Sequence, residues 1–115
     1  MSIARENLTR AIFEDTVYAA ASEALVKNKF ITELGAIAGD GEPGCVSIYD
    51  WNSGDRFSVV RIGTVKVISG AAVSVGADVQ SDSEGRAVTL DAGVKNGRAL
   101  TAATGANQIM VIQVS

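Results

Sequence analysis

The sequence of 115 residues lacks histidine and contains a single cysteine and a single proline. Without histidine there is no Ser-His-Asp triad, no activated Cys-His pair and no imidazole ligand for a metal ion. The lone Cys45 excludes an intramolecular disulfide and fits a chain made in a reducing compartment, where it serves as a small, half-buried hydrophobic residue. Carboxylates and lysines remain as candidate catalytic groups.

Charge and hydropathy limit the partners further. The formal net charge is −3 and the ten lysines and arginines are scattered, whereas a nucleic-acid-binding protein needs a basic footprint. No apolar run approaches the roughly 20 residues that span a bilayer, and the segment after Met1 lacks the basic and apolar regions of a signal peptide. We therefore expect a chain that binds neither nucleic acid nor membranes.

Large side chains are also scarce. Hydrophobic residues make up 47% of the chain, but most of them are Ala and Val, and only three Phe, two Tyr and one Trp are present. A chain of this length forms one domain and buries about two thirds of its unfolded surface. A core built from small side chains is thin, which favours further burial in an oligomer or against a partner.

We predict an N-terminal arm over residues 1–28. The segment has no Gly or Pro and is rich in Ala, Glu, Leu and Arg, so its local preference is helical or irregular. Its apolar stripe is narrow, and an extended arm that becomes ordered against a neighbouring molecule is an equal alternative to a helix packed on its own domain. The apolar anchors of this arm are expected to be Phe13, Val17, Tyr18 and Leu25.

A compact β domain is predicted over residues 29–115. All 12 glycines lie between Gly35 and Gly105, and short Val- and Ile-rich runs alternate with turn residues. Such a pattern predicts a mainly β fold, a small barrel or a sandwich-like domain. Gly63 interrupts the longest run and predicts a bulge or a sharp bend. The predicted strand segments are CVSIY (45–49), RFSVVRIGTVKVI (56–68), DVQS (78–81), RAVTL (86–90) and QIMVIQV (108–114).

One glycine-rich motif resembles a nucleotide site but lacks its context. GDGEPG (39–44) matches G-x-G-x-x-G, in which glycines and a helix N-terminus bind pyrophosphate. Here the two carboxylates would repel phosphate, and the strand-like CVSIY follows in place of a helix. We expect a surface loop.

A second motif resembles a calcium loop. QSDSEGRAVTLD (80–91) places Gln80, Asp82, Glu84, Gly85 and Asp91 in an EF-hand-like register. Calcium usually requires an acidic first residue and a bidentate Glu at the last position, and both ends depart from this. The flanks are strand-like, so DSEG is predicted as a hairpin turn, with an Asx-type turn at Asp82 and a left-handed Gly85.

Two further segments are predicted to be turns. The Asn-Gly pair in KNG (95–97) is the strongest signal for a type I′ turn. DWNSGD (50–55) is predicted as a hairpin tip in which Trp51 anchors the tip or contacts a partner. The alternative reading of this tip is a sugar site, with Trp51 as a stacking platform beside Asp50 and Asp55.

The second half of the chain, from about Phe57 to Ser115, resembles the capsid cement, or decoration, proteins of tailed phages. The likeness lies in the order and spacing of strands and small-residue turns in VVRIGTVKVISGAAVSVGADVQSDSEGRAVTL (59–90) and GRALTAATGANQIMVIQV (97–114). The resemblance implies a small β-rich domain, often a homotrimer, that docks on the outer face of an assembled capsid and reinforces it.

This resemblance implies a full set of expectations. The partners would be the major capsid protein and further copies of the chain, and the location would be the capsid surface of the virion after synthesis in the host cytoplasm. No cofactor, metal or catalytic residue is expected. The contacts with the capsid or with neighbouring subunits are expected from Phe13, Val17, Tyr18, Leu25 and Trp51.

Two other classes of function stay open on the sequence. A carbohydrate- or receptor-binding β module on a virion or cell surface would use the Trp51 loop. A small enzyme would depend on Asp40 or Glu42 as its acid or base.

Overall fold

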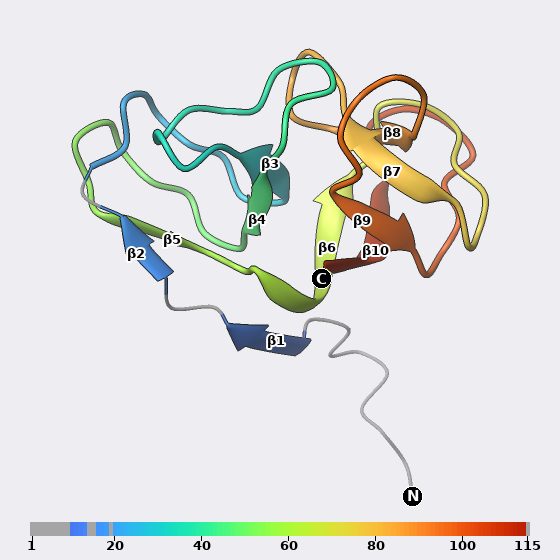
Figure 1. The fold of residues 1–115 in the computed structure, drawn as a ribbon, viewed down its shortest axis with the longest axis horizontal. Coiled ribbons are helices and arrows are strands. Elements are labelled where there is room, and N and C mark those ends of the chain that lie inside the picture. Colours follow the sequence, from blue (N-terminus) through green and yellow to red (C-terminus); the bar gives the residue numbers. More distant parts are fainter. Residues whose placement is uncertain (1–9, 14–15, 19, 115) are drawn as a thin grey trace, which may run out of the picture.

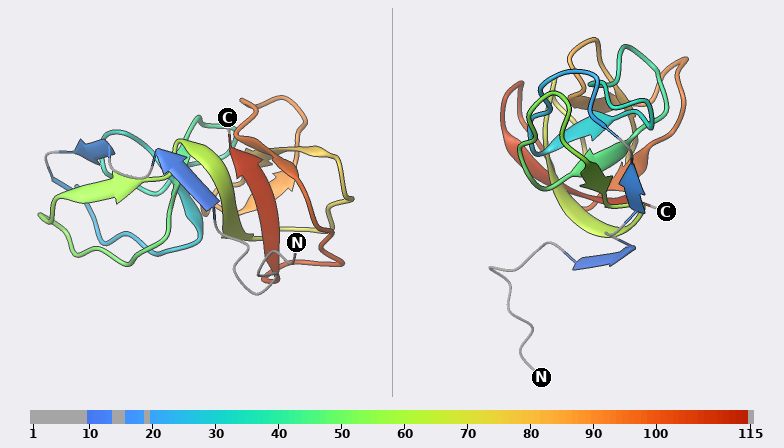
Figure 2. Two further views of the ribbon diagram at one scale, coloured as in Figure 1. Left: turned by 90° about the horizontal axis from the view of Figure 1, so that it is seen from below. Right: turned by 90° about the vertical axis from the view of Figure 1, so that its left-hand side faces the viewer.

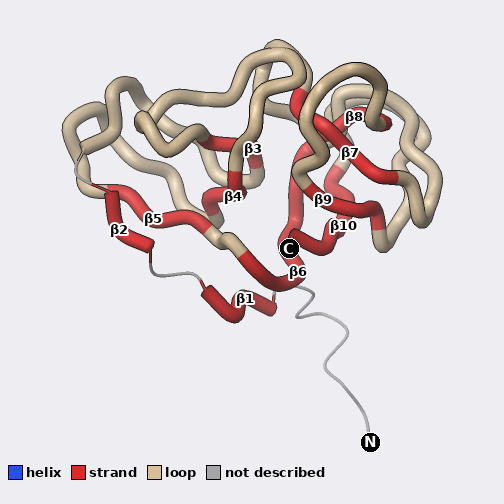
Figure 3. Tube along the Cα trace, in the orientation of Figure 1, coloured by secondary structure: helices blue, strands red, loops and turns tan. Residues whose placement is uncertain are grey.

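The computed structural model describes residues 10–13, 16–18 and 20–114, with side chains described for residues 20–114. Every regular element in these residues is a strand, so the prediction of a mainly β fold is confirmed (Figures 1 and 3). The described part contains no helix of the length and hydrophobicity that a membrane span requires. The strands are β1 (Arg10–Phe13), β2 (Thr16–Tyr18), β3 (Lys29–Ile31), β4 (Cys45–Ser47), β5 (Phe57–Val59), β6 (Ile62–Ile68), β7 (Asp78–Ser81), β8 (Ala87–Thr89), β9 (Gly97–Ala99) and β10 (Ile109–Val114).

The antiparallel pair β6–β10 forms the centre of a six-stranded sheet with the order β1-β6-β10-β9-β7-β8. The pairing extends from Ile109 opposite Ile68 to Val114 opposite Gly63, and Figure 2 shows β1, β6 and β10 side by side. On one face of the pair, Val65, Val67 and the side chains facing them from β10 are buried, while Thr64 and Lys66 on the other face are only half-buried. This alternation is typical of an antiparallel sheet with one face on the core.

The described part of the N-terminal arm is extended. β1 pairs antiparallel with β6, and β2 pairs antiparallel with β5. The sequence left a helix and an extended arm open, and these strands are extended because the edge of residues 57–64 offers N–H and C=O groups that need partners. Such pairing outweighs a weak helical propensity. The predicted irregularity is present: Gly63 has a φ of 139°, and the register shifts opposite it, between Ala11 and Phe13.

Two clusters of buried side chains form the core. The larger cluster lies under the six-stranded sheet and includes Val65, Val67 and Ile112. The smaller one consists of Ala21, Leu25, Ile31, Phe57 and Val59. Residues on both sides of position 28 therefore share one cluster, and the division into arm and domain at that position stays a prediction.

The described strands do not close into a barrel. The large sheet ends in β1 on one side and in β8 on the other, and the remaining sheets, β2-β5 and β3-β4, have two strands each. The edge strand β8 meets the chain just after β6 only through a single parallel bridge, between Ser69 and Ala87. A ladder interrupted in this way leaves the sheet open, so the barrel alternative is wrong for this part of the chain.

The DSEG segment forms the predicted hairpin turn between β7 and β8. The Asp82 N–H donates to the Arg86 carbonyl at 2.8 Å, and Gly85 has a φ of 75°. The Asp82 carboxylate accepts the N–H groups of Glu84 and Arg86 and forms a 2.8 Å ion pair with the Arg86 guanidinium. Oxygen atoms that a calcium loop would offer to a metal are thus engaged in the turn itself.

The Asn-Gly pair is not the predicted turn. A type I′ turn requires positive φ at both central residues, and neither Asn96 nor Gly97 has one. Asn96 is 7% exposed and Gly97 begins β9. The prediction was wrong because the Asn96 side chain is recruited by a distant loop, which overrides the local turn preference.

That loop belongs to a feature that we call the loop clasp, formed by residues 39–44 and 91–96. The Gly41 N–H donates to the Ser81 carbonyl at 2.8 Å, and the Val94 N–H donates to the Gly41 carbonyl at 2.9 Å. A Cβ atom on Gly93 would lie 2.4 Å from the Gly41 Cα. The glycines of GDGEPG therefore allow close backbone approach, and the strand β4 follows the loop, as expected.

Substitution of Gly93 tests this close approach. Gly93→Ala is expected to lower the free energy of unfolding by about 2 kcal/mol, because the methyl group overlaps backbone atoms that cannot move alone. Urea denaturation measures the change. The matched control is Gly105→Ala, where a Cβ meets only the Gln108 Nε2 at 4.0 Å, and it should stay within about 0.5 kcal/mol. Equal unfolding midpoints for the two variants would contradict the clasp.

Candidate functional site

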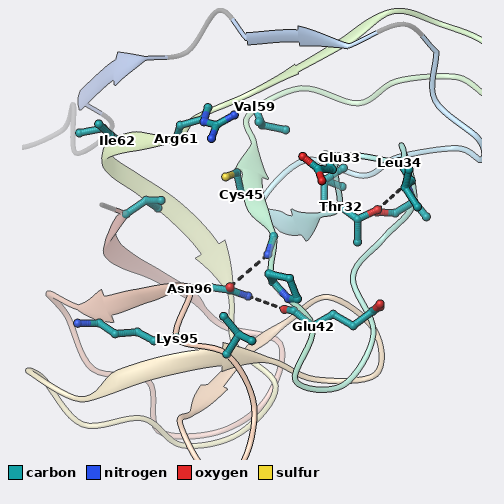
Figure 4. A pocket seen from close by; sticks show the side chains of 16 residues that line it. Thr32, Glu33, Leu34, Glu42, Cys45, Val59, Arg61, Ile62, Lys95 and Asn96 are labelled. Atoms are coloured by element: carbon teal, nitrogen blue, oxygen red, sulfur yellow. Dashed lines mark hydrogen bonds between the residues drawn. The ribbon is translucent and has the colours of Figure 1, made fainter.

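A groove of about 870 Å³ lies between the β3–β4 hairpin and the end of the β6–β10 pair (Figure 4). Ile31 and Cys45 come to it from β3 and β4, Val59 from β5 and Val114 from the end of β10. The three aliphatic side chains are almost fully buried and Cys45 is half-buried. The bottom of the groove is therefore apolar and fixed by strands.

The two sides of the groove carry opposite charges. We call Glu33, Leu34 and Glu42 the acidic wall, and Ile62, Val94 and Lys95 the basic wall; Figure 4 shows Leu34 and Lys95 on opposite sides. Each wall also exposes hydrophobic surface. Leu34 is 80% exposed, Val94 47% and Ile62 38%. Exposed apolar side chains gathered at one concave site are typical of a binding surface.

Asn96 connects the two walls. Its Nδ2 donates to the Glu42 carbonyl at 3.0 Å, and its Oδ1 accepts the Gly44 N–H at 3.1 Å. Its own N–H donates to the Val79 carbonyl at 2.8 Å, so the residue is also tied to β7. The side chain of Asn96 thus holds the Glu42 end of the acidic wall against the loop that carries Val94 and Lys95.

Cys45 is the one thiol of the chain and lines the groove. Burial raises the pKa of the Cys45 thiol, while the Arg61 guanidinium lowers it and the Glu33 carboxylate raises it by smaller amounts. A raised pKa keeps the group as a thiol at neutral pH, where it is a poor nucleophile. Cys45 therefore behaves as the half-buried hydrophobic residue that the sequence suggested.

The predicted contact residues are distributed over several elements. Phe13 lies in β1, and Val17 and Tyr18 lie in β2, but their side chains fall outside the described residues. Leu25 is 2% exposed and belongs to the smaller core cluster. In this conformation its side chain supports the fold and is closed to a partner.

Trp51 is half-buried and lies near the tip between β4 and β5. Its Nε1 donates to the Ser47 Oγ at 2.8 Å, and its ring packs edge-to-face against Tyr49 with centroids 5.8 Å apart. The two nearby carboxylates accept hydrogen bonds from backbone N–H groups. Asp50 accepts the Lys27 N–H and Asp55 accepts the Asn52 N–H, both at 2.9 Å. These groups, on which the sugar-site alternative depends, are used by the loop structure.

The carboxylates of the enzyme alternative are likewise part of a loop. The Glu42 Oε1 accepts the Gly39 N–H at 2.6 Å, which closes the turn of the loop clasp. Asp40 is exposed at the same turn. Within residues 20–114, no group of three or more Cys, Asp or Glu side chains is arranged to hold a metal ion.

Sequence reasoning missed the residues that make the groove. Leu34 stands alone in the polar turn between Thr32 and Gly35, Val94 is a single aliphatic residue next to Lys95, and Ile62 belongs to the predicted strand segment 56–68. An isolated aliphatic residue normally needs no functional explanation. The only available signal was a leucine within a turn, at a position that usually takes a polar residue.

The described chain thus combines an open antiparallel sheet, an extended arm and a groove lined by charged and exposed apolar side chains, which defines a small β protein. The model of the phage cement protein family matches residues 13–115, and the chain belongs to this family. It is accordingly a capsid-associated structural protein of a phage particle.

The fold has a counterpart among solved structures. The head fiber gp8.5 N base of bacteriophage phi29 superposes with a TM-score of 0.70 and 20% sequence identity, over 87% of this chain and 93% of that one. At this identity the likeness concerns the fold. No curated protein matches the sequence.

Removal of the Asn96 amide tests its role between the walls. Asn96→Ala leaves the Gly44 N–H and the Glu42 carbonyl without their partner, and is expected to lower the free energy of unfolding by about 2 to 3 kcal/mol. Scanning calorimetry can measure the loss. Asn52→Ala, at an exposed position, is the control and should change stability by less than about 0.5 kcal/mol. A fully stable Asn96→Ala protein would show that the walls are held by other contacts.

The raised pKa of Cys45 predicts slow alkylation. In the folded protein, the rate of reaction with iodoacetamide should rise with pH through a midpoint above that of the same chain in guanidinium chloride, because burial disfavours the thiolate. Mass spectrometry of the alkylated chain gives both profiles. Steric shielding alone would slow the reaction without moving the midpoint, so coincident midpoints would refute the burial effect.

Proposed function

We propose that this chain is a cement protein that binds the outer surface of an assembled phage head and stabilises the lattice. The observation that carries the proposal is the family match over residues 13–115, which covers the whole predicted β domain and about half of the predicted arm. The head fiber base of phage phi29, which shares the fold, is itself named as a part of a phage head. Such a function needs no catalytic group, because a protein that stabilises a lattice acts through the shape and position of its binding surface.

The proposed partners are the major capsid protein and further copies of the chain, assembled as a homotrimer. Each trimer would bridge several capsid subunits. Contacts that are weak singly become strong together when one rigid body makes several of them at once. This mechanism suits a protein with a thin core and an open sheet, because no single contact has to bury a large apolar surface.

The proposed capsid contacts are Phe13, Val17 and Tyr18 of the arm, with Trp51 at the loop tip. β1 and β2 lie on the outside of residues 57–64, so one edge of the arm pairs with the domain while the other edge belongs to no described sheet. Exposed strand edges are common recognition elements, since a partner can add main-chain hydrogen bonds to them. Leu25 is left out of this set because it is buried.

Co-sedimentation with expanded phage shells tests the function. The wild-type protein should pellet with shells to saturation, and the double variant Val17→Ser/Tyr18→Ser should bind about tenfold more weakly. The two substitutions replace the two apolar residues of β2 that the sequence predicts as contacts. Val26→Ser, at a 41% exposed position outside the arm strands, is the matched control.

The result that would overturn the proposal is equally direct. The wild-type protein would stay in the supernatant while the same shells retained another small capsid-binding protein. Equal binding of the double variant and the wild type would move the capsid contact away from β2 but leave the function standing.

A further inference from the structure

The two walls of the groove are complementary to each other, which suggests what they bind. The acidic wall presents Leu34 at the tip of a turn closed by the Gly35 N–H and the Thr32 carbonyl at 3.0 Å. The basic wall presents Val94 next to Lys95, and Ile62 lies farther along the same side of the groove, beside Arg61 (Figure 4). One wall thus offers an exposed leucine near two carboxylates, and the other offers exposed aliphatic side chains, one of them next to an ammonium group.

The charges of the two walls are available for a partner. Within the described part of the chain, Glu33 and Glu42 form no ion pair, although Glu42 caps the Gly39 N–H. Lys95 makes only a 3.4 Å contact with Asp78, and both side chains are about half exposed, at 51% and 43%. Ion pairs of this kind at a surface are weak and exchange easily.

We propose that the acidic wall of one copy packs against the basic wall of the next copy, head to tail. Leu34 then lies against Val94 of the neighbouring copy, and Glu33 lies near the neighbour's Lys95. Charge favours a second copy of the chain as the binding partner, because each copy carries both an acidic and a basic wall. Apolar centres with complementary charges at the rim are typical of specific interfaces.

The contact is heterologous, since the two walls are different surfaces. Heterologous contacts close into rings when the rotation between copies closes, so this inference rests on the homotrimer of the proposed function and specifies its interface. Cys45 lies in the groove between the walls and would be shielded as the ring forms. It therefore reports on assembly without any added label.

Charge exchange tests the pairing. Glu33→Lys and Lys95→Glu should each raise the dissociation constant of the oligomer by about tenfold or more, because each places like charges opposite one another. The double variant Glu33→Lys/Lys95→Glu restores an opposite-sign contact between copies and should reassemble. Sedimentation equilibrium over a range of concentrations gives the mass of each protein, and Cys45 alkylation should slow as the fraction of oligomer rises.

Matched controls exclude a general effect of charge or hydrophobicity. Lys27→Glu and Glu84→Lys reverse exposed charges outside the groove and should leave the mass unchanged. Leu34→Ser should weaken assembly, whereas Val75→Ser, at a 64% exposed position outside the groove, should not.

Several results would overturn the inference. These are a wild-type protein that is monomeric or only dimeric at all concentrations, single reversals that assemble like the wild type, and a double variant that fails to recover. The capsid assay stays independent of these outcomes, because a monomer that still pellets with shells would refute the interface while preserving the proposed function.

Discussion

The antiparallel pairing of β6 with β10 is the contact on which the rest of the structure depends. It joins two segments more than 40 residues apart in the chain, at Ile109 opposite Ile68, so it must overcome a large loss of chain entropy. Burial of alternate Val, Ile and Met side chains on one face provides the compensating free energy. Once the pair is formed, its two outer edges receive β1 and β9, and its end forms one side of the groove.

Much of this fold could be predicted from the sequence because its signals are local. β7 coincides with the DVQS segment, and β10 fills all but the first residue of QIMVIQV. The DSEG turn could be predicted because Asp82 and Gly85 act within five residues of one another. β3 and β9 were missed because each owes its strand geometry to neighbours that the sequence does not place beside it; the equally short β4, β5 and β8 lie in Val-rich segments.

The groove could not be predicted either, because its residues come together only in the folded chain. Leu34, Ile62 and Val94 are far apart in the chain; Leu34 and Val94 look like ordinary surface residues, and Ile62 looks like one residue of a long strand. Asn96 illustrates the conflict most clearly: its sequence context predicts an exposed turn, but its amide bonds with Glu42 and Gly44, more than 50 residues away, bury it. The local sequence preference determines the backbone conformation where no distant contact competes with it, and it is overridden where a tertiary hydrogen bond is available.

The small residues of this chain leave a thin core, and they also allow the close loop contacts that shape the groove. Gly41 and Gly93 bring two loops into backbone contact, which lets one asparagine hold both walls. The walls themselves carry few groups, and exposed ion pairs contribute only about 0 to 1 kcal/mol each. A single contact of this kind selects the correct neighbour more than it provides affinity. In the proposed capsid assembly, the same selective contact would recur in every copy of the oligomer, and the affinity would come from the number of contacts that one assembly makes at once.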